Sequence, residues 1–433
     1  MSKKVIRASR APASTSGVSK LQAMRCRGSR CRPDCQSPMT ATTLPDASAV
    51  PRRRIATFII LAIAGVLVAL SLMVVVPPYT LTLFRLGVGA IEYSPILLLL
   101  DLLWCLPVNR VLRARRTLRF AILALLIASA CVAVRPLTQF TRASATASAQ
   151  MGTEGSISRF SLVAVVGGLP TNPAVQERTI PYVAPDGERL TLRLYALAPR
   201  HSRPTVVVLY GGAWSGGAPT QCENVSKALA SRGYTVAAID YRHAPASRFP
   251  AQIDDVNRAL MMLRDSSESW GIDHHRMAIL GRSSGGHLAE LAAFTPNDFG
   301  LKAVIALYAP FDLTAGYVDL PSPDPLDVRL ALRSLLGSTP SQQPRRYRAA
   351  SPSELIRPGL PPTLLLFGGR DHIVKPVFNR QAASALRAAR VPVISVELPW
   401  AEHGFDMLPT GLGAQLAFNV ITEFLDRELT LRP

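Results

Sequence analysis

The stretch AILGRSSGGH at residues 278–287 decides the fold class of this chain. An apolar run leads into the pattern G-x-S-x-G and then directly into a helical pattern, so Ser283 is expected on a sharp strand-to-helix turn with its hydroxyl exposed. Gly281 and Gly285 allow strand and helix to approach closely, and the start of the helix favours negative charge beside the serine oxygen. The pentapeptide also occurs by chance in loops, so the surrounding sequence must support Ser283 as a nucleophile.

The order of elements after residue 176 predicts an α/β fold. Asp186-Gly187 marks a hairpin between the first two strands, and buried apolar strands then alternate with helical patterns. The predicted strands cover residues 179–183, 190–196, 205–209, 235–239, 277–280, 303–308, 363–367 and 393–398. Such alternation implies βαβ units, so we expect an eight-stranded, mostly parallel sheet with helices on both faces.

A catalytic serine needs a base to take its proton and a carboxylate to orient that base. His403 follows the last predicted strand, and Asp371 follows the strand before it. The order Ser283, Asp371, His403 is the one expected when a G-x-S-x-G turn carries the nucleophile. Asp312 is the alternative acid, although its place before a helical pattern is also typical of a helix cap. His287, one helical turn beyond Ser283, is expected to make a structural hydrogen bond.

The loop after the third predicted strand reads YGGAW at residues 210–214. A loop in this position supplies N–H groups to the negatively charged oxygen of the reaction intermediate, together with the residue after the nucleophile. Gly212, Ala213 and Ser284 are therefore the predicted donors of the oxyanion hole.

From about Gln176 to its end, the chain resembles α/β-hydrolases of the hormone-sensitive-lipase and feruloyl-esterase-like (BD-FAE-like) branch, which also includes kynurenine formamidases. The matching stretches are residues 210–214, 240–245, 249–250, 254–255, 281–287, 369–371 and 403–405. The resemblance implies hydrolysis of a small-molecule carboxylic ester through an acyl-enzyme on Ser283, with no cofactor and no metal ion. An amidase or arylformamidase shares every motif. A non-catalytic binding module usually lacks the serine or the histidine, and both are present.

Three positions depart from the family pattern: Tyr210 stands where His is usual, Arg282 where an acidic or small residue is usual, and Ser284 where Ala is common. Arg282 either favours an anionic acyl group or, as we prefer, forms an ion pair with a surface carboxylate.

Residues 311–362 form a long insertion that we expect to cap the strand ends and shape the acyl pocket. With Tyr210 and Trp214 nearby, a short-chain or aryl ester is expected.

The N-terminal part carries three apolar stretches. Residues 55–76 are 22 residues without a charge, enough for a helix to cross the hydrocarbon core. Residues 86–108 include Glu92, Pro95 and Asp101, and residues 120–134 are short and flanked by arginines. We expect about three transmembrane helices within residues 55–136.

The charge distribution favours a membrane rather than a nucleic-acid partner. Residues 1–136 carry 19 Lys and Arg against 4 Asp and Glu, a net charge of +15 out of +19. The basic residues gather before the first stretch and between the second and third, as the positive-inside rule expects for a cytoplasmic N-terminus. We therefore expect a disordered basic cytoplasmic tail (1–54), a Ser, Thr and Ala-rich tether (137–175) and an extracytoplasmic hydrolase domain (176–433) on a multi-pass cell-membrane protein. No pattern indicates an oligomeric state.

Overall fold

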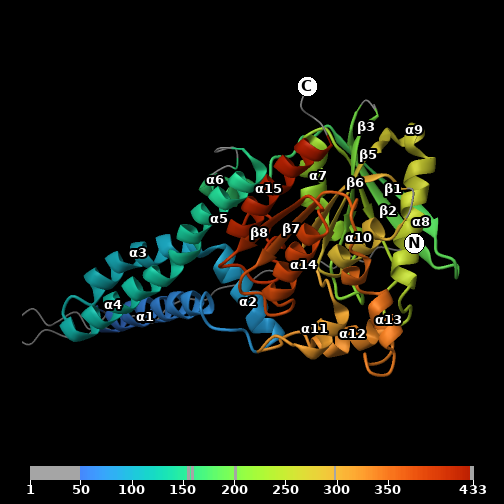
Figure 1. Cartoon of the computed structure of the whole chain (residues 1–433). Helices are drawn as coiled ribbons and strands as arrows, with labels where there is room; N and C mark the ends of the chain where they lie inside the picture. The colour runs from blue at the N-terminus through green and yellow to red at the C-terminus, as the bar shows by residue number, and fades with distance from the viewer. Residues whose placement is uncertain (1–48, 154–156, 158–159, 199–201, 297–298, 430–433) are drawn as a thin grey trace, which may run out of the picture. The chain divides into compact units, whose positions relative to one another are not determined.

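The computed structural model of the chain describes residues 49–153, 157, 160–198, 202–296 and 299–429 (Figure 1). The chain divides into a unit Met1–Val50 and a unit Pro51–Pro433, and the structure below is that of the second unit. The basic tail predicted over residues 1–54 lies, as far as residue 48, outside the described residues.

Within this unit, the predicted hydrolase domain, called the catalytic unit below and described from Val175 to Leu429, is built on one eight-stranded sheet with the order β1-β2-β4-β3-β5-β6-β7-β8. Its strands are β1 Val175–Val183, β2 Arg189–Leu197, β3 Arg203–Leu209, β4 Thr235–Ile239, β5 Ile272–Arg282, β6 Leu301–Leu307, β7 Thr363–Gly368 and β8 Val393–Leu398. β1 and β2 form an antiparallel hairpin, β2 also runs antiparallel to β4, and all other neighbours are parallel. The predicted α/β-hydrolase fold is confirmed.

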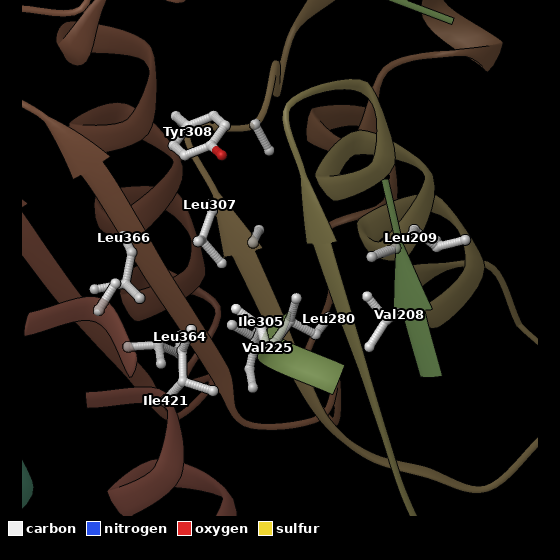
Figure 2. Close-up of a cluster of buried hydrophobic side chains, with 14 of the residues drawn as sticks. Val208, Leu209, Val225, Leu280, Ile305, Leu307, Tyr308, Leu364, Leu366 and Ile421 are labelled. Carbon is white, nitrogen blue, oxygen red and sulfur yellow. The ribbon is translucent and has the colours of Figure 1, made fainter. Parts of the chain in front are cut away.

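The strands lie where the sequence predicts them, and β5 differs most at its ends. It begins at Ile272 rather than Met277, because Ile272 and Asp273 also pair with Arg203 and Pro204 before the register shifts. Its centre is a continuous apolar run, as expected for a strand covered on both faces. Figure 2 shows the core around it, where Leu280 and Ile305 of the sheet lie near Val225 and Ile421.

Helices follow the strands in the order that βαβ units require. They are α7 Glu223–Ser231, α8 Ala251–Asp265, α9 Ser267–Trp270, α10 Ser284–Phe294, α11 Leu313–Val318, α12 Val328–Leu336, α13 Pro344–Ala349, α14 Pro376–Ala388 and α15 Leu412–Glu428, with 3-10 turns η1 Pro219–Cys222 and η2 Pro352–Leu355. α8 and α10 pack on each other and on β5, whereas α15 packs on β6 and β7. The insertion at residues 311–362 holds α11, α12, α13 and η2.

The described part of the N-terminal region is mainly helical, and its helices are α1 Ala49–Met73, α2 Leu81–Glu92, α3 Ser94–Val111, α4 Arg116–Ala133, α5 Arg135–Met151 and α6 Leu162–Gly167. Three described segments are long and apolar enough to cross a membrane: Arg53–Met73, Ser94–Val111 and Arg116–Met151. Asp101 of α3 joins the three together, because its Oδ2 accepts hydrogen bonds from Ser129 of α4 at 2.7 Å and Ser71 of α1 at 3.4 Å.

The prediction that residues 86–108 form one membrane span is wrong for the first third of that range. α2 ends at Glu92, and α3 begins at Ser94 with Pro95 in its first turn, where the missing N–H of proline costs nothing. Residues 86–92 therefore belong to a separate helix, and Glu92 packs against α15 of the catalytic unit. Val88, Ala90 and Ile91 of this segment are buried, whereas Leu86 is exposed.

The flexible tether predicted over residues 137–175 is also wrong in its first part. Residues 135–151 form α5, which packs on β8 and α15. The Gln150 side chain bonds both backbone groups of Ser395 in β8, at 2.9 and 3.0 Å, and Phe140 packs on Trp400. The alanines of this segment favour a helix once an apolar face has something to pack on.

Candidate active site

The turn between β5 and α10 carries Ser283 in the predicted position. Its backbone has φ +52° and ψ −121°, a conformation that L-residues rarely adopt. The turn is tight: a Cβ atom on Gly281 would lie 2.1 Å from the Gly285 carbonyl oxygen, and one on Gly285 would lie 2.3 Å from that of Tyr210. Only glycine fits at both places, so the G-x-S-x-G pattern is required by geometry.

Ser283, His403 and Asp371 form a continuous chain of hydrogen bonds. Ser283 Oγ lies 2.8 Å from His403 Nε2, and His403 Nδ1 lies 2.8 Å from Asp371 Oδ2. The other oxygen of Asp371 accepts the backbone N–H groups of Ile373 at 2.8 Å and Val374 at 2.7 Å. Asp371 thus holds the Nδ1–H tautomer, which leaves the Nε2 lone pair facing the serine hydroxyl.

The loop after β3 lies beside this turn. Gly212, Ala213 and Trp214 follow one another with φ of +152°, +52° and +57°. A Cβ atom on Gly212 would lie 2.0 Å from the Gly216 carbonyl oxygen. Within the described chain, the N–H groups of Gly212, Ala213 and Ser284 donate to no backbone carbonyl, which leaves them available to a ligand.

His287 connects the loop after β3 to the cap insertion. Its Nδ1 accepts from Trp214 Nε1 at 3.1 Å, and its Nε2 donates to the Ala350 carbonyl at 2.6 Å. Complete burial lowers the pKa of His287 to about 4, so the ring is neutral. Its contacts are those of a structural residue, as the sequence predicts.

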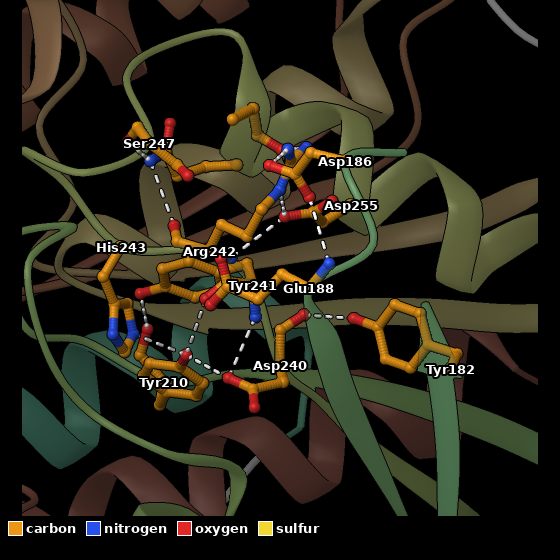
Figure 3. Close-up of polar contacts among 12 residues, drawn as sticks. Tyr182, Asp186, Glu188, Tyr210, Asp240, Tyr241, Arg242, His243, Ser247 and Asp255 are labelled. Carbon is orange, nitrogen blue, oxygen red and sulfur yellow. Dashed lines mark hydrogen bonds and ion pairs between the residues drawn. The ribbon is translucent and has the colours of Figure 1, made fainter. Parts of the chain in front are cut away.

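Tyr210 packs the loop and does not line the site. Its hydroxyl donates to Asp240 Oδ1 at 2.5 Å, and its ring stacks on Tyr241 with centroids 4.5 Å apart (Figure 3). The expectation that Tyr210 provides aromatic surface to the substrate is therefore wrong, whereas Trp214 does line a cavity. Sequence reasoning also missed Arg242, which pairs with Asp255 of α8 at 2.8 Å and with Asp186 of the β1–β2 hairpin at 2.7 Å.

Arg282 forms an ion pair, as preferred from the sequence, but its partner is a buried carboxylate rather than a surface one. Its Nε lies 2.5 Å from Asp406 Oδ2, and the other oxygen of Asp406 accepts the Tyr308 hydroxyl. All three side chains are buried. The pair joins the nucleophile turn to the loop that carries His403.

A second pair, missed in the sequence, lies directly beside the triad. His372 Nδ1 lies 2.8 Å from Glu402 Oε1, and the two residues neighbour Asp371 and His403 along the chain. Burial alone would lower the pKa of His372, but the hydrogen bond and charge of Glu402 outweigh burial and raise the pKa. The pair fixes the acid loop against the base loop. The sequence signal that could have revealed this pair is the two dipeptides Asp371-His372 and Glu402-His403, each an acid followed by a histidine.

Two cavities meet at Ser283. The smaller, about 50 Å³, is lined mainly by the cap insertion and by Trp214. The larger, about 370 Å³, is lined by His403 and Tyr308 on one side.

Asp312, the alternative acid, caps α11 by accepting the Ala315 N–H at 2.9 Å. Among the described residues, no group of three or more His, Cys, Asp or Glu side chains is arranged to hold a metal ion.

Comparisons with known proteins find esterases among the relatives of this chain. The BD-FAE family model matches residues 194–386. Esterase LipC of Mycobacterium tuberculosis is 31% identical over 56% of this chain and 63% of its own length. Esterase LipQ of the same organism is 30% identical over 58% and 62%, and an acetyl-hydrolase of Streptomyces hygroscopicus is 30% identical over 47% and 69%. The chain thus spans a little over three fifths of the length of the two mycobacterial relatives.

Solved structures show the same fold. An esterase of Rhizomucor miehei superposes with a TM-score of 0.53 at 20% identity, covering 66% of this chain and 97% of its own. The hyperthermophilic esterase of Pyrobaculum calidifontis also gives 0.53, at 22% identity, covering 67% and 92%. The sequence match to the acetyl-hydrolase, the family model and the eight-stranded sheet lead to one conclusion: this chain belongs to the α/β-hydrolase esterase family.

Proposed function

We propose that this protein hydrolyses carboxylic esters through an acyl-enzyme formed on Ser283. The observation that supports this most directly is the chain of two 2.8 Å hydrogen bonds from Ser283 through His403 to Asp371, at the meeting point of two cavities. A serine whose proton can pass to an oriented imidazole is activated for attack on a carbonyl carbon.

Each step uses a group already in place. His403 Nε2 takes the proton as Ser283 Oγ bonds to the carbonyl carbon, and the backbone N–H groups of Gly212, Ala213 and Ser284 stabilise the resulting oxyanion. The imidazolium then gives its proton to the leaving alcohol, which leaves the acyl group on Ser283. Water, activated by the same histidine, attacks this ester and releases the carboxylic acid.

Each of the two cavities is assigned one half of the substrate. Because the leaving alcohol takes its proton from His403, the alcohol belongs in the larger cavity, which His403 lines. The acyl group then occupies the smaller one. An apolar cavity of about 150 Å³ holds a benzene ring, so about 50 Å³ has room only for a short acyl chain.

A series of p-nitrophenyl esters with chains from acetate to decanoate tests this proposal. We expect the acetate to be preferred and the longer chains to be poor, with Ser283→Ala and His403→Ala each inactive but folded. Full activity in either variant would contradict the mechanism. A formanilide tested beside the acetate distinguishes an esterase from an amidase, because an amidase would cleave the anilide at a comparable or higher rate.

We propose further that three apolar helices, α1, α3 and α4, cross the cell membrane and that the catalytic unit lies on its outer side. Arg52, Arg53 and Arg54 lie at the start of the first segment, and residues 110–119, where the second segment ends and the third begins, hold five arginines. The positive-inside rule places both groups in the cytoplasm. Alkaline phosphatase fused after Pro433 should be active and a cytoplasmic reporter there silent; the opposite pattern would contradict this orientation.

A further inference from the structure

One wall of the larger cavity comes from outside the catalytic fold. Leu81, Phe84 and Arg85 of α2 line it, together with Ser283 and His403. Their spacing of three and four residues puts them on one face of the helix. α2 lies well before residues 194–386, the part of the chain that the family model matches. The cavity that we assign to the alcohol is thus completed by a segment outside the part of the chain that the family model matches.

α2 is held firmly in this position. Glu92, its last residue, is buried and accepts the Gly413 N–H of α15 at 2.6 Å. The next residue, Tyr93, lies 3.1 Å from Thr410 through their hydroxyl groups. A Cβ atom on Gly411 would lie 2.5 Å from Glu92 Oε2, so the two segments pack in direct contact. The wall is therefore a fixed part of the site.

α2 also connects two candidate membrane spans. α1 ends at Met73 and α3 begins at Ser94, so a chain crossing the bilayer in both must carry α2 at the membrane surface. Tyr79, just before α2, and Leu86, within it, are 71% and 50% exposed, as suits a segment in contact with lipid headgroups. The larger cavity would then open beside the bilayer.

The charge at this wall is positive and unbalanced. Arg85 is exposed and has neither an ion pair nor a hydrogen bond with any residue in the described part of the chain. It is the only charged residue between Val74 and Ile91. The carboxylate of Asp406, which also lines the cavity, is already paired with Arg282. An acidic group on a substrate would find Arg85 as its partner.

We propose that the alcohol part of the substrate is an anionic lipid, with its hydrocarbon chain along Leu81 and Phe84 and its acidic group on Arg85. The inference rests on the proposed esterase function. The reaction is hydrolysis: water cleaves the short acyl ester, the acyl group leaves as a carboxylic acid, and the lipid alcohol remains at the membrane. Arg85 acts as a specificity-determining residue because it binds a part of the substrate remote from the bond that breaks.

The test uses the full chain in phosphatidylcholine vesicles with two probes, a 1-alkyl-2-acetylglycerol 3-phosphate and the same acetylglycerol without phosphate. The measured quantity is the ratio of kcat/KM for the phosphate probe to kcat/KM for the neutral one. A hydrogen-bonded charge pair is worth about tenfold or more. We expect Arg85→Gln to lower the ratio about tenfold through KM, Arg85→Lys to retain most of it, and Arg258→Gln, an exposed control on α8, to leave the ratio unchanged.

A third probe, acetylglycerol phosphate without the alkyl chain, separates a lipid from a soluble anion. It should be a poorer substrate than the alkylated phosphate, and Leu81→Ser should reduce that difference. Equal turnover of the two phosphate probes would overturn the lipid assignment. If p-nitrophenyl acetate is hydrolysed but Arg85→Gln leaves the kcat/KM ratio unchanged, the inference about Arg85 is overturned. If the wild-type protein hydrolyses none of these esters, the proposed function itself is overturned.

Discussion

Replacing Glu92 by Gln tests whether α2 is packed on the catalytic unit. Glu92 is 1% exposed, and its Oε1 has no hydrogen-bond partner within the described structure. Burial raises the pKa of Glu92 from 4.5 to about 8, against the opposing hydrogen bonds from the backbone of Gly413 and Ala414. The folded protein therefore holds a proton that the unfolded chain releases.

The sign of the effect follows from this difference. Below pH 4.5 Glu92 is protonated in both the folded and the unfolded protein, so it does not lower the free energy of unfolding. As the pH rises from 4.5 toward 8, only the unfolded chain ionises, which favours unfolding. Above pH 8 the loss of stability stays constant. The gap between 4.5 and about 8 corresponds to about 5 kcal/mol at most, or about 1.4 kcal/mol for each pH unit. Gln stays neutral throughout, and its amide oxygen can still accept the Gly413 N–H.

The assay is unfolding followed by tryptophan fluorescence between pH 5 and pH 9. We expect the free energy of unfolding of Glu92→Gln to lie within about 1 kcal/mol of the wild-type value at pH 5 and to exceed it by several kcal/mol at pH 9. Glu268→Gln, an exposed carboxylate on α9, is the matched control and should follow the wild type at every pH. Identical pH dependence of Glu92→Gln and wild type would mean that Glu92 is ionised in the folded protein and that α2 is not buried against α15.

Three further changes test the active site. Asp371→Asn should lower kcat by about 10⁴ without unfolding, because the wrong imidazole tautomer then faces Ser283; near-normal turnover of p-nitrophenyl acetate would contradict this. Gly212→Ala should lower kcat about 10²- to 10³-fold by displacing an oxyanion donor, whereas Gly216→Ala, where a Cβ meets nothing within 4 Å, should not. Leu332→Ala should cost about 2–5 kcal/mol of stability and shift the preferred acyl chain to a longer one; an unchanged chain-length profile would refute the acyl-cavity assignment.

The strands and the triad residues could be read from the sequence because their signals are local. A buried parallel strand is a continuous apolar run, and the turn at Ser283 requires glycines at fixed positions on either side. Asp371 and His403 follow from chain order, since each comes directly after a strand whose carboxyl end meets the same edge of the sheet.

The N-terminal part was harder because the deciding contacts are distant in sequence. Hydropathy does not tell an apolar face against lipid from one against protein, and the partner of Glu92 is Gly413, 321 residues away. The same holds for α5, whose alanines fit a flexible segment until Gln150 meets Ser395 of β8. Arg282 shows the limit again: an ion pair was foreseeable, but its burial with Asp406 depends on how three loops meet.

The most direct test of the account is the identity of the residue that carries the acyl group. The full chain is treated with a fluorophosphonate, which modifies activated serines, and the labelled peptide is identified by mass spectrometry. We expect a single adduct on Ser283 that is absent in Ser283→Ala and present in the exposed-serine control Ser269→Ala. Labelling of a different residue, or ester hydrolysis that persists in Ser283→Ala, would contradict the central claim that Ser283 is the nucleophile.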